Sequence, residues 1–372
     1  PFYLQDLGVS SIAEVAFWVG LISSLQPICM AITAPLWGIL ADRYGRKLML
    51  ARAMIGGGVA LALAGLAANP QQLAAFRIME GVLAGTVAAA TTLVVVTIPR
   101  EQTGYGLGLL QTGMFTGHFV GPLLGGALGG TLGYRAAFLI AALLLASAGL
   151  LVAVIVKENF VRPTAARQAG NPVLQTVRSV FKKPLVLTML MLLTLNHVSV
   201  GVTMPVLPLY VQTLTPDLKQ ASAATGVIVG ATALANALAA IWVGRSAERW
   251  GWRKAILVCL ALGAVSHLPQ GLTLHLWQLL ALRILTGFAL GGINPVANAV
   301  IAAASPAGGQ GGVYGVSASL NALGRALGPV IGAAVVAGWG VAGVFPVTGV
   351  LLFVVTAFVG WRTAGADMPR RT

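Results

Sequence analysis

An arginine and a glutamate stand three residues apart within a long apolar stretch of the chain, Arg77 and Glu80. On a helix this spacing places both side chains on one face, where they can form an ion pair. Charged side chains are costly in a hydrocarbon environment, so we expect both to face an internal cavity. Glu80 is also the only acidic residue deep within such a stretch. It is therefore a candidate to take up and release a proton, with Arg77 setting its proton affinity. A purely structural ion pair is the alternative interpretation.

Further polar side chains occur within other apolar stretches. They are mostly amides, with one histidine and one arginine: Gln26, His118, Asn196, Asn236, Arg283, Asn294, Asn298 and Asn321. Scattered amides in apolar walls would suit a large, mostly apolar substrate with few polar groups. Hydrogen bonding between helices is the alternative role for each asparagine. For Arg283, steering of anionic substrate groups and a packing and snorkelling role both stay open.

The sequence offers no residue set for catalysis or for holding a metal ion. The four histidines are scattered, and the motifs HExxH, GxSxG and the nucleotide-binding loop are absent. The two cysteines lie singly in separate apolar runs. We therefore expect neither an enzyme nor a metal site, and no cofactor.

The elements that must position these residues are long apolar segments. Apolar residues make up 57% of the 372 residues and charged residues only 9%, against about 25% charged in soluble domains. The apolar runs are continuous rather than alternating, which indicates transmembrane helices and not barrel strands. We predict eleven spans, at residues 13–40, 48–67, 73–97, 106–130, 136–156, 185–211, 221–243, 255–273, 276–303, 314–338 and 343–361.

The basic residues sort to one side of these spans. Of the 23 lysines and arginines, 18 fall in loops or the tail on one side, two on the other, and three lie within spans. The positive-inside rule then places the basic side, both termini and the 157–183 loop in the cytoplasm. Nucleic acid is excluded as a partner, because a basic groove would need these charges on one folded surface.

Three motifs recur at a nearly constant offset of 206 or 207 residues. They are Gly38-x3-Asp42-Arg43-x-Gly45 with Gly244-x3-Glu248-Arg249-x-Gly251, Arg77-x3-Gly81 with Arg283-x3-Gly287, and Gly117-x3-Gly121-Pro122-x2-Gly125 with Gly324-x3-Gly328-Pro329-x2-Gly332. A constant offset implies a duplicated six-helix unit. We expect an N-terminal bundle at 1–156, a linker at 157–183 and a C-terminal bundle at 184–372. Within the linker, Asn171–Lys183 has the pattern of a helix on the membrane surface, and a flexible segment is the alternative.

The repeat also places residue 1 at the end of a helix rather than before one. Pro208-Leu-Tyr210-Val-Gln212 corresponds to Pro1-Phe-Tyr3-Leu-Gln5 at the offset of 207. The second half begins near Lys183, so we expect about 24 further residues, a first transmembrane helix, before residue 1. The intact protein would then have twelve helices, and the first one is an alternative location for the main proton-coupling acid.

The segment Gly38-Ile-Leu-Ala-Asp42-Arg43-Tyr-Gly45-Arg46-Lys47 resembles the loop 2–3 signature of the major facilitator superfamily, and the resemblance extends over the whole chain. It implies an all-α membrane protein of two six-helix bundles related by pseudo-two-fold symmetry, here with eleven helices visible and the first missing. In this family the motif latches the halves in the outward-open state. That implies a gating role for Gly38, Asp42, Arg43, Gly45, Arg46 and Lys47, and for Glu248 and Arg249 in the second copy. A basic membrane anchor is the alternative.

A second resemblance concerns Gly108-x8-Gly117-x3-Gly121-Pro122-x2-Gly125-Gly126, which is similar to the antiporter motif of drug:proton antiporters. Small residues four apart let helix backbones touch, and Pro122 can kink the helix. Arg77-x-x-Glu80-Gly81 resembles the helix 4 motif, which implies proton transfer, although that motif more often has an amide where Glu80 stands. The resemblance implies proton-coupled efflux of amphipathic small molecules or drugs by alternating access, by a monomer in the bilayer of the cytoplasmic membrane. A same-fold exporter of a sugar, amino acid or metallophore, or an uptake transporter, is the alternative.

Overall fold

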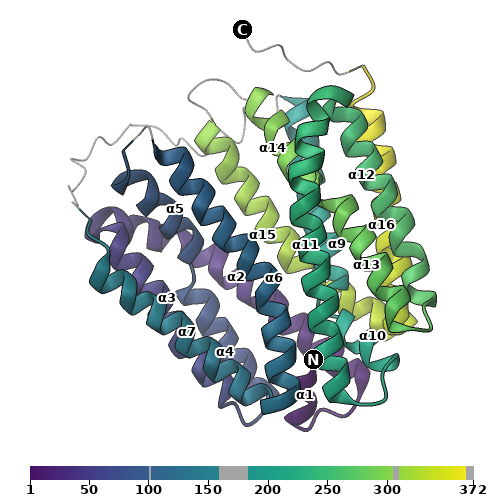
Figure 1. Cartoon of the computed structure of the whole chain (residues 1–372), viewed down its shortest axis with the longest axis horizontal. Coiled ribbons are helices and arrows are strands. Elements are labelled where there is room, and N and C mark those ends of the chain that lie inside the picture. Colours follow the sequence, from purple (N-terminus) through teal and green to yellow (C-terminus); the bar gives the residue numbers. More distant parts are fainter. Residues whose placement is uncertain (100–101, 159–182, 305–309, 366–372) are drawn as a thin grey trace.

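The computed structural model describes residues 1–99, 102–158, 183–304 and 310–365, and within these ranges every regular element is helical (Figure 1). The first half contains α1 (Phe2–Asp6), α2 (Ile12–Tyr44), α3 (Arg46–Gly65), α4 (Pro70–Leu83), α5 (Thr86–Thr97), α6 (Thr103–Leu132) and α7 (Tyr134–Ile155). The second half contains α9 (Pro184–Thr203), α10 (Leu207–Thr213), α11 (Leu218–Trp250), α12 (Trp252–His267), η2 (Leu268–Leu272), α13 (Leu276–Gly291), α14 (Ile293–Ala304), α15 (Gln310–Trp339), η3 (Val341–Gly343) and α16 (Val344–Arg362).

In the described ranges these helices make eleven passes along the molecule, at the places predicted from the apolar runs. Nine of the passes are long and apolar enough to cross a membrane. The other two are the broken pass α4–α5 and α6, whose ten glycines in 30 residues lower its mean hydropathy. The all-helical membrane fold is thus confirmed. The predicted linker helix at Asn171–Lys183 falls almost entirely outside the described residues.

Three passes predicted as single helices are broken, so these three predictions were wrong in detail. The predicted span 185–211 is divided into α9 and α10 at residues 204–206. The predicted span 73–97 is divided into α4 and α5 at Ala84 and Gly85. Gly85 has a backbone φ of +129°, a value that residues other than glycine rarely adopt. The predicted span 276–303 is divided into α13 and α14 at Gly292. The breaks at Gly85 and Gly292 lie at equivalent positions of the sequence repeat. Hydropathy alone does not reveal them, because the apolar run continues through each break.

Side-chain contacts repeat with the same offset as the sequence motifs. The Tyr3 hydroxyl donates to the Ala67 carbonyl (3.3 Å), and the equivalent Tyr210 hydroxyl donates to the Thr273 carbonyl (3.2 Å). The Gln5 side-chain amide donates to the side-chain oxygen of its own counterpart, Gln212, at 3.0 Å. Since two equivalent residues bond to each other, the pseudo-two-fold axis passes beside this pair.

The ends of the molecule differ in charge. The α2–α3 and α11–α12 turns and the ends of α7 and α16 lie at one end, which we call the basic end, and α1 and α10 lie at the opposite end (Figure 1).

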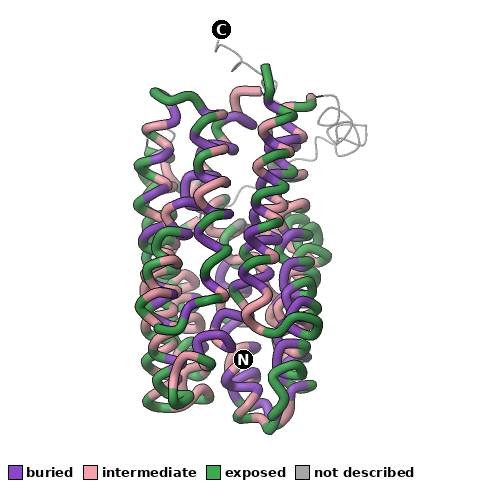
Figure 2. Tube along the Cα trace, turned by 90° about the vertical axis from the view of Figure 1, so that its right-hand side faces the viewer, coloured by how far each residue is buried: buried purple, intermediate pink, exposed green. Residues whose placement is uncertain are grey.

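Exposed residues recur along the whole length of the outer helices (Figure 2). On α7 they include large apolar side chains, among them Leu143 and Val154, which are 70% and 73% exposed. Apolar exposure on this scale fits a helix that faces lipid.

The two halves touch at the opposite end and separate toward the basic end. A Cβ at Gly226 of α11 would lie 2.5 Å from the Pro122 carbonyl oxygen of α6, and one at Gly20 of α2 would lie 2.9 Å from the Pro329 carbonyl oxygen of α15. Nearer the basic end on the same four helices, a Cβ at Gly38, Gly108, Gly244 or Gly315 would meet no described atom within 4 Å. The interior between the halves is therefore closed at the opposite end.

Candidate substrate and proton site

Three polar side chains from α2 and α4 form a closed ring of hydrogen bonds. Arg77 Nη1 donates to Glu80 Oε2 at 2.5 Å, and Arg77 Nη2 donates to Gln26 Oε1 at 2.7 Å. Gln26 Nε2 closes the ring by donating to Glu80 Oε1 at 3.2 Å. Arg77 and Glu80 are 26% and 20% exposed, so the ring is neither solvated at the surface nor fully enclosed. The predicted Arg77–Glu80 pair is confirmed as a contact.

Close packing of the two helix backbones brings Gln26 into reach of α4. A Cβ on Gly81 would lie 2.5 Å from the Gln26 carbonyl oxygen, so only glycine allows α4 to approach α2 this closely. The break after α4 leaves backbone carbonyls without helical partners. The carbonyl of Val82 instead accepts hydrogen bonds from Trp37 Nε1 (2.6 Å) and Thr33 Oγ1 (3.2 Å) of α2. The break and the ring are thus held against the same helix.

The second half carries the arginine of this site without the acid. At the offset of 206, Arg283 corresponds to Arg77, Thr286 to Glu80 and Thr232 to Gln26. The Thr286 hydroxyl bonds to Ser266 Oγ (2.9 Å) and Gln270 Nε2 (2.8 Å) rather than to Arg283. Arg283 is 4% exposed, and its charge has no acidic partner among the described residues.

A cavity of about 350 Å³, here called the central cavity, lies between the second half and α6. It brings together five of the predicted substrate residues: His118, Asn196, Asn236, Arg283 and Asn294. A neighbouring cavity of about 370 Å³ between α2, α9 and α15 is lined by Gln26 and Arg325 and shares His197 with the first. Asn298 and Asn321 line neither cavity, and the Asn321 amide donates to Ser317 Oγ on its own helix (3.4 Å).

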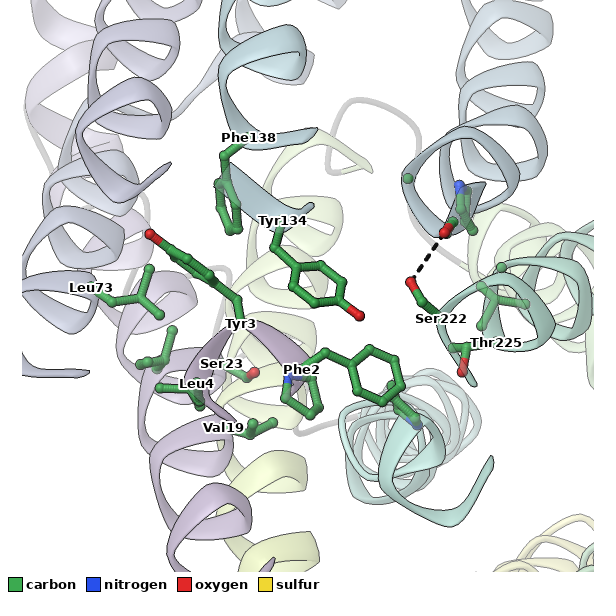
Figure 3. Close-up of a pocket in the computed structure, with 18 of the residues that line it drawn as sticks. Phe2, Tyr3, Leu4, Val19, Ser23, Leu73, Tyr134, Phe138, Ser222 and Thr225 are labelled. Carbon is green, nitrogen blue, oxygen red and sulfur yellow. Dashed lines mark hydrogen bonds between the residues drawn. The ribbon is translucent and has the colours of Figure 1, made fainter. Parts of the chain in front are cut away.

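A third cavity, of about 420 Å³, lies near the opposite end and is lined mainly by nonpolar residues, with four aromatic rings in its wall. The rings of Phe2, Tyr3 and Tyr134 lie on one side of it and Ser222 on the other (Figure 3). Arg77 also lies in the wall of this third cavity. The ring of Gln26, Arg77 and Glu80 therefore stands between this mostly apolar cavity and the interior between the two halves. Among the described residues no group of three or more histidine, cysteine, aspartate or glutamate side chains could hold a metal ion.

The sequence profile described as "Major Facilitator Superfamily" matches residues 1–215 and 189–370, which together span almost the whole chain. The chain belongs to the major facilitator superfamily. It is therefore a multi-pass membrane transporter and not an enzyme.

Relatives and solved structures agree with this assignment. The chain is 33% identical over 364 residues to the multidrug resistance protein MdtG of Salmonella typhimurium, which covers 98% of this chain and 89% of that protein. The same figures hold for MdtG of Salmonella dublin. A bacterial homolog of the human lysosomal transporter Spinster, in an inward-facing and occupied conformation, superposes with a TM-score of 0.81 at 15% identity over 100% of this chain and 92% of that chain. The nucleoside transporter NupG superposes with a TM-score of 0.76 at 15% identity over 93% and 91%. At such identity the structures show the fold alone.

The glycines of the antiporter motif differ between the two copies in this transporter. In the second copy, a Cβ at Gly324, Gly328 or Gly332 would meet α9 at 2.5–2.6 Å, so α15 and α9 are in backbone contact. In the first copy, Gly126 packs in the same way against the Ser222 carbonyl oxygen of α11 (2.6 Å). A Cβ at any of the other motif glycines would meet no described atom within 4 Å: Gly108, Gly117, Gly121 and Gly125. Helix contact through the motif is thus observed for the second copy and for Gly126.

The predicted gate motif occupies the α2–α3 turn at the basic end. Gly45 forms the turn with a φ of +96°, and Gly251 forms the equivalent α11–α12 turn with a φ of +85°. Arg43 lies over the ring of Tyr44, 5.4 Å from its centre. The side chains of Asp42 and Glu248 lie outside the described part of the structure, and Arg249 lies in the last turn of α11. A latch between the halves stays a prediction, because the halves are apart at this end.

One polar residue of the gate region was missed by the sequence analysis. Glu158, just after α7, accepts hydrogen bonds from the backbone N–H groups of Arg46 (3.0 Å) and Lys47 (2.8 Å) through its two carboxylate oxygens. A carboxylate is favourable there, because the first N–H groups of α3 have no helical partners and lie at the positive end of the helix dipole. The sequence signal, an acid directly after the last apolar run of the first half, was too weak to indicate the partner.

Proposed function

We propose that this transporter exports amphipathic small molecules in exchange for protons, by alternating access of the interior to the two sides of the cytoplasmic membrane. The ring of Gln26, Arg77 and Glu80 is the observation that carries the proposal. It holds an acid inside the helix bundle, in hydrogen-bonded contact with two helices. The name of the MdtG relatives, multidrug resistance protein, supports drugs as the class of substrate.

The positive-inside rule places the basic end of the molecule in the cytoplasm. The contacts at Gly226 and Gly20 then close the outer side, so the described conformation is open to the cytoplasm. In the alternate conformation the basic ends approach each other, and the gate motif with Arg43 and Arg249 latches them. The transporter acts as a monomer in the bilayer, and the proton gradient is its energy source without any cofactor.

Proton uptake by Glu80 would remove the negative charge that holds Arg77 and would weaken the hydrogen bond from Gln26. Gln26 belongs to α2, and α2 also packs against α15 of the other half through Gly20. A change in the ring can therefore alter the contact between the halves, which is the equilibrium that alternating access requires. Protonation and substrate release are coupled in this way through one helix.

The test measures uptake of the neutral dye Nile red into everted membrane vesicles, with and without an acid-inside pH gradient. The unaltered protein should accumulate dye only with the gradient. Glu80→Gln should abolish gradient-driven uptake but retain exchange of labelled for unlabelled substrate without a gradient. Glu14→Gln is the matched control, since Glu14 is an exposed acid in the first turn of α2. Full gradient-driven uptake by Glu80→Gln, or uptake that ignores a collapsed gradient, would refute the proposal.

A further inference from the structure

The guanidinium of Arg283 is buried in the wall of the central cavity without an acidic partner among the described residues. The side chain is 4% exposed, and its Nε and Nη2 atoms are buried with no hydrogen-bond acceptor in the part of the chain that the structure describes. The guanidinium lies over the ring of Phe345, whose centre is 5.3 Å from the guanidinium carbon. An aromatic face attracts a cation but accepts none of its directed N–H groups. A buried charge with free donors is costly, which calls for an acceptor that binds there.

The repeat shows how this transporter satisfies such an arginine elsewhere. Arg77, the equivalent residue, donates to a carboxylate and to an amide oxygen. Arg283 has Thr286 where that carboxylate would stand, and the Thr286 hydroxyl is already bonded to Ser266 and Gln270. The second half therefore has the arginine donor but no carboxylate acceptor at the position equivalent to Glu80.

The rest of the central cavity matches a ligand with one anionic group. None of the described residues that line it is acidic, so it offers no counter-charge to a cationic ligand. Its other polar groups are amides, hydroxyls and the imidazoles of His118, His197 and His267, while Val229 and Leu290 supply apolar wall. Its volume of about 350 Å³ falls in the usual range for small-molecule sites, roughly 300–1,000 Å³.

We infer that Arg283 binds the carboxylate, or a comparable planar oxyanion, of a transported molecule, so that the substrates include anionic or zwitterionic amphipathic compounds beside neutral ones. The planar fork of the guanidinium suits such a group, because two parallel N–H donors can meet its two oxygens. This inference names the substrate class of the site and thus rests on the proposed export function.

The test compares three naphthalene probes of similar size: 1-naphthoate, 1-naphthamide and 1-naphthylmethylamine. Binding of each to the purified full-length chain is measured by scintillation proximity. The naphthoate should bind at least about tenfold more tightly than the amide, the ratio expected for a charged hydrogen bond, and the amine should bind most weakly. Equal binding of acid and amide, or tighter binding of the amine, would overturn the inference without any variant.

Variants then assign the preference to the residue. Arg283→Gln should remove the tenfold preference, because it weakens naphthoate binding more than naphthamide binding, and Arg283→Lys should restore only part of the preference because lysine lacks the fork. Arg135→Gln, which removes an exposed arginine at the opposite end, should keep the full preference. A preference that survives in Arg283→Gln would overturn the assignment.

Gradient-driven uptake of Nile red, measured with the same preparations, separates the two proposals. Dye uptake without a preference for the acid overturns the anionic substrate class alone. A preference for the acid without any gradient-driven uptake supports the anion site and overturns the proposed export function.

Discussion

The packing of Gly81 against α2 makes a quantitative prediction about the proton site. An alanine at this position would place its Cβ 2.5 Å from the Gln26 carbonyl oxygen, where ordinary contact begins at 3.4 Å. The helices must therefore separate by about 0.9 Å. The Gln26–Glu80 hydrogen bond would lengthen from 3.2 Å to about 4 Å, and the Arg77–Gln26 bond from 2.7 Å to about 3.6 Å. Both distances lie beyond hydrogen-bond range.

Gly81→Ala should thus leave the Arg77–Glu80 pair intact, because both residues lie on α4, while detaching Gln26. A hydrogen bond to a charged group contributes about 1.5–3 kcal/mol, so coupling through the ring should weaken by roughly 10-fold or more. The overpacking itself should cost about 1–3 kcal/mol of stability. We expect gradient-driven dye uptake to fall by about tenfold, measured as the initial rate in everted vesicles at equal amounts of protein.

The repeat supplies a matched control. Gly287 is the equivalent glycine of α13, and a Cβ there would meet the Thr232 carbonyl oxygen in the same way, but no acid stands beside it. Gly287→Ala should lose similar stability in thermal unfolding while keeping a larger share of gradient-driven uptake. If Gly81→Ala folds and transports at the unaltered rate, or if both variants lose transport equally, the ring does not depend on this helix contact.

Two further predictions concern helix ends and helix packing. Glu158→Gln keeps a side-chain oxygen but removes the charge at the start of α3, so we expect a loss of about 0.5–1 kcal/mol in thermal unfolding; an unchanged melting temperature at low salt would contradict the capping role. Gly328→Ala would place a Cβ 2.6 Å from the Gly201 Cα and should lower the melting temperature by forcing α15 from α9, whereas Gly315→Ala has open space and should be neutral. Equal melting temperatures for the two glycine variants would show that the α9–α15 contact is not tight.

Local patterns in the sequence were sufficient for the passes and for the charged pair. Each pass is set by its own apolar run, because burying backbone polar groups in lipid demands a helix whatever its neighbours are. Arg77 and Glu80 lie one helical turn apart, so their pairing follows from spacing alone. The repeat likewise needed only comparison of the chain with itself, and it anticipated the bond between Gln5 and Gln212 only as an equivalence, not as a contact.

Contacts between helices required the tertiary structure. Gln26 was predicted as a substrate residue, yet it completes the hydrogen-bonded ring with Arg77 and Glu80, and Arg77 stands 51 residues further along the chain. The packing of helices also brings Asn196, Asn236 and Asn294 together with Arg283 in one cavity. The same packing leaves Asn298 and Asn321 outside that cavity. The breaks at Gly85 and Gly292 were also visible only in the tertiary structure, because hydropathy does not depend on the direction of the backbone.

The sequence by itself determined a duplicated, all-helical membrane protein with one acid deep within the apolar spans of the given sequence. Hydropathy and charge act residue by residue against the bilayer, so these properties can be summed along the chain. Only the tertiary structure decided that Glu80 is hydrogen-bonded to side chains of two helices, while Nε and Nη2 of Arg283 find no acceptor among the described residues. The free energy of a buried charge depends on which donors and acceptors surround it, and those come from segments far apart in the sequence.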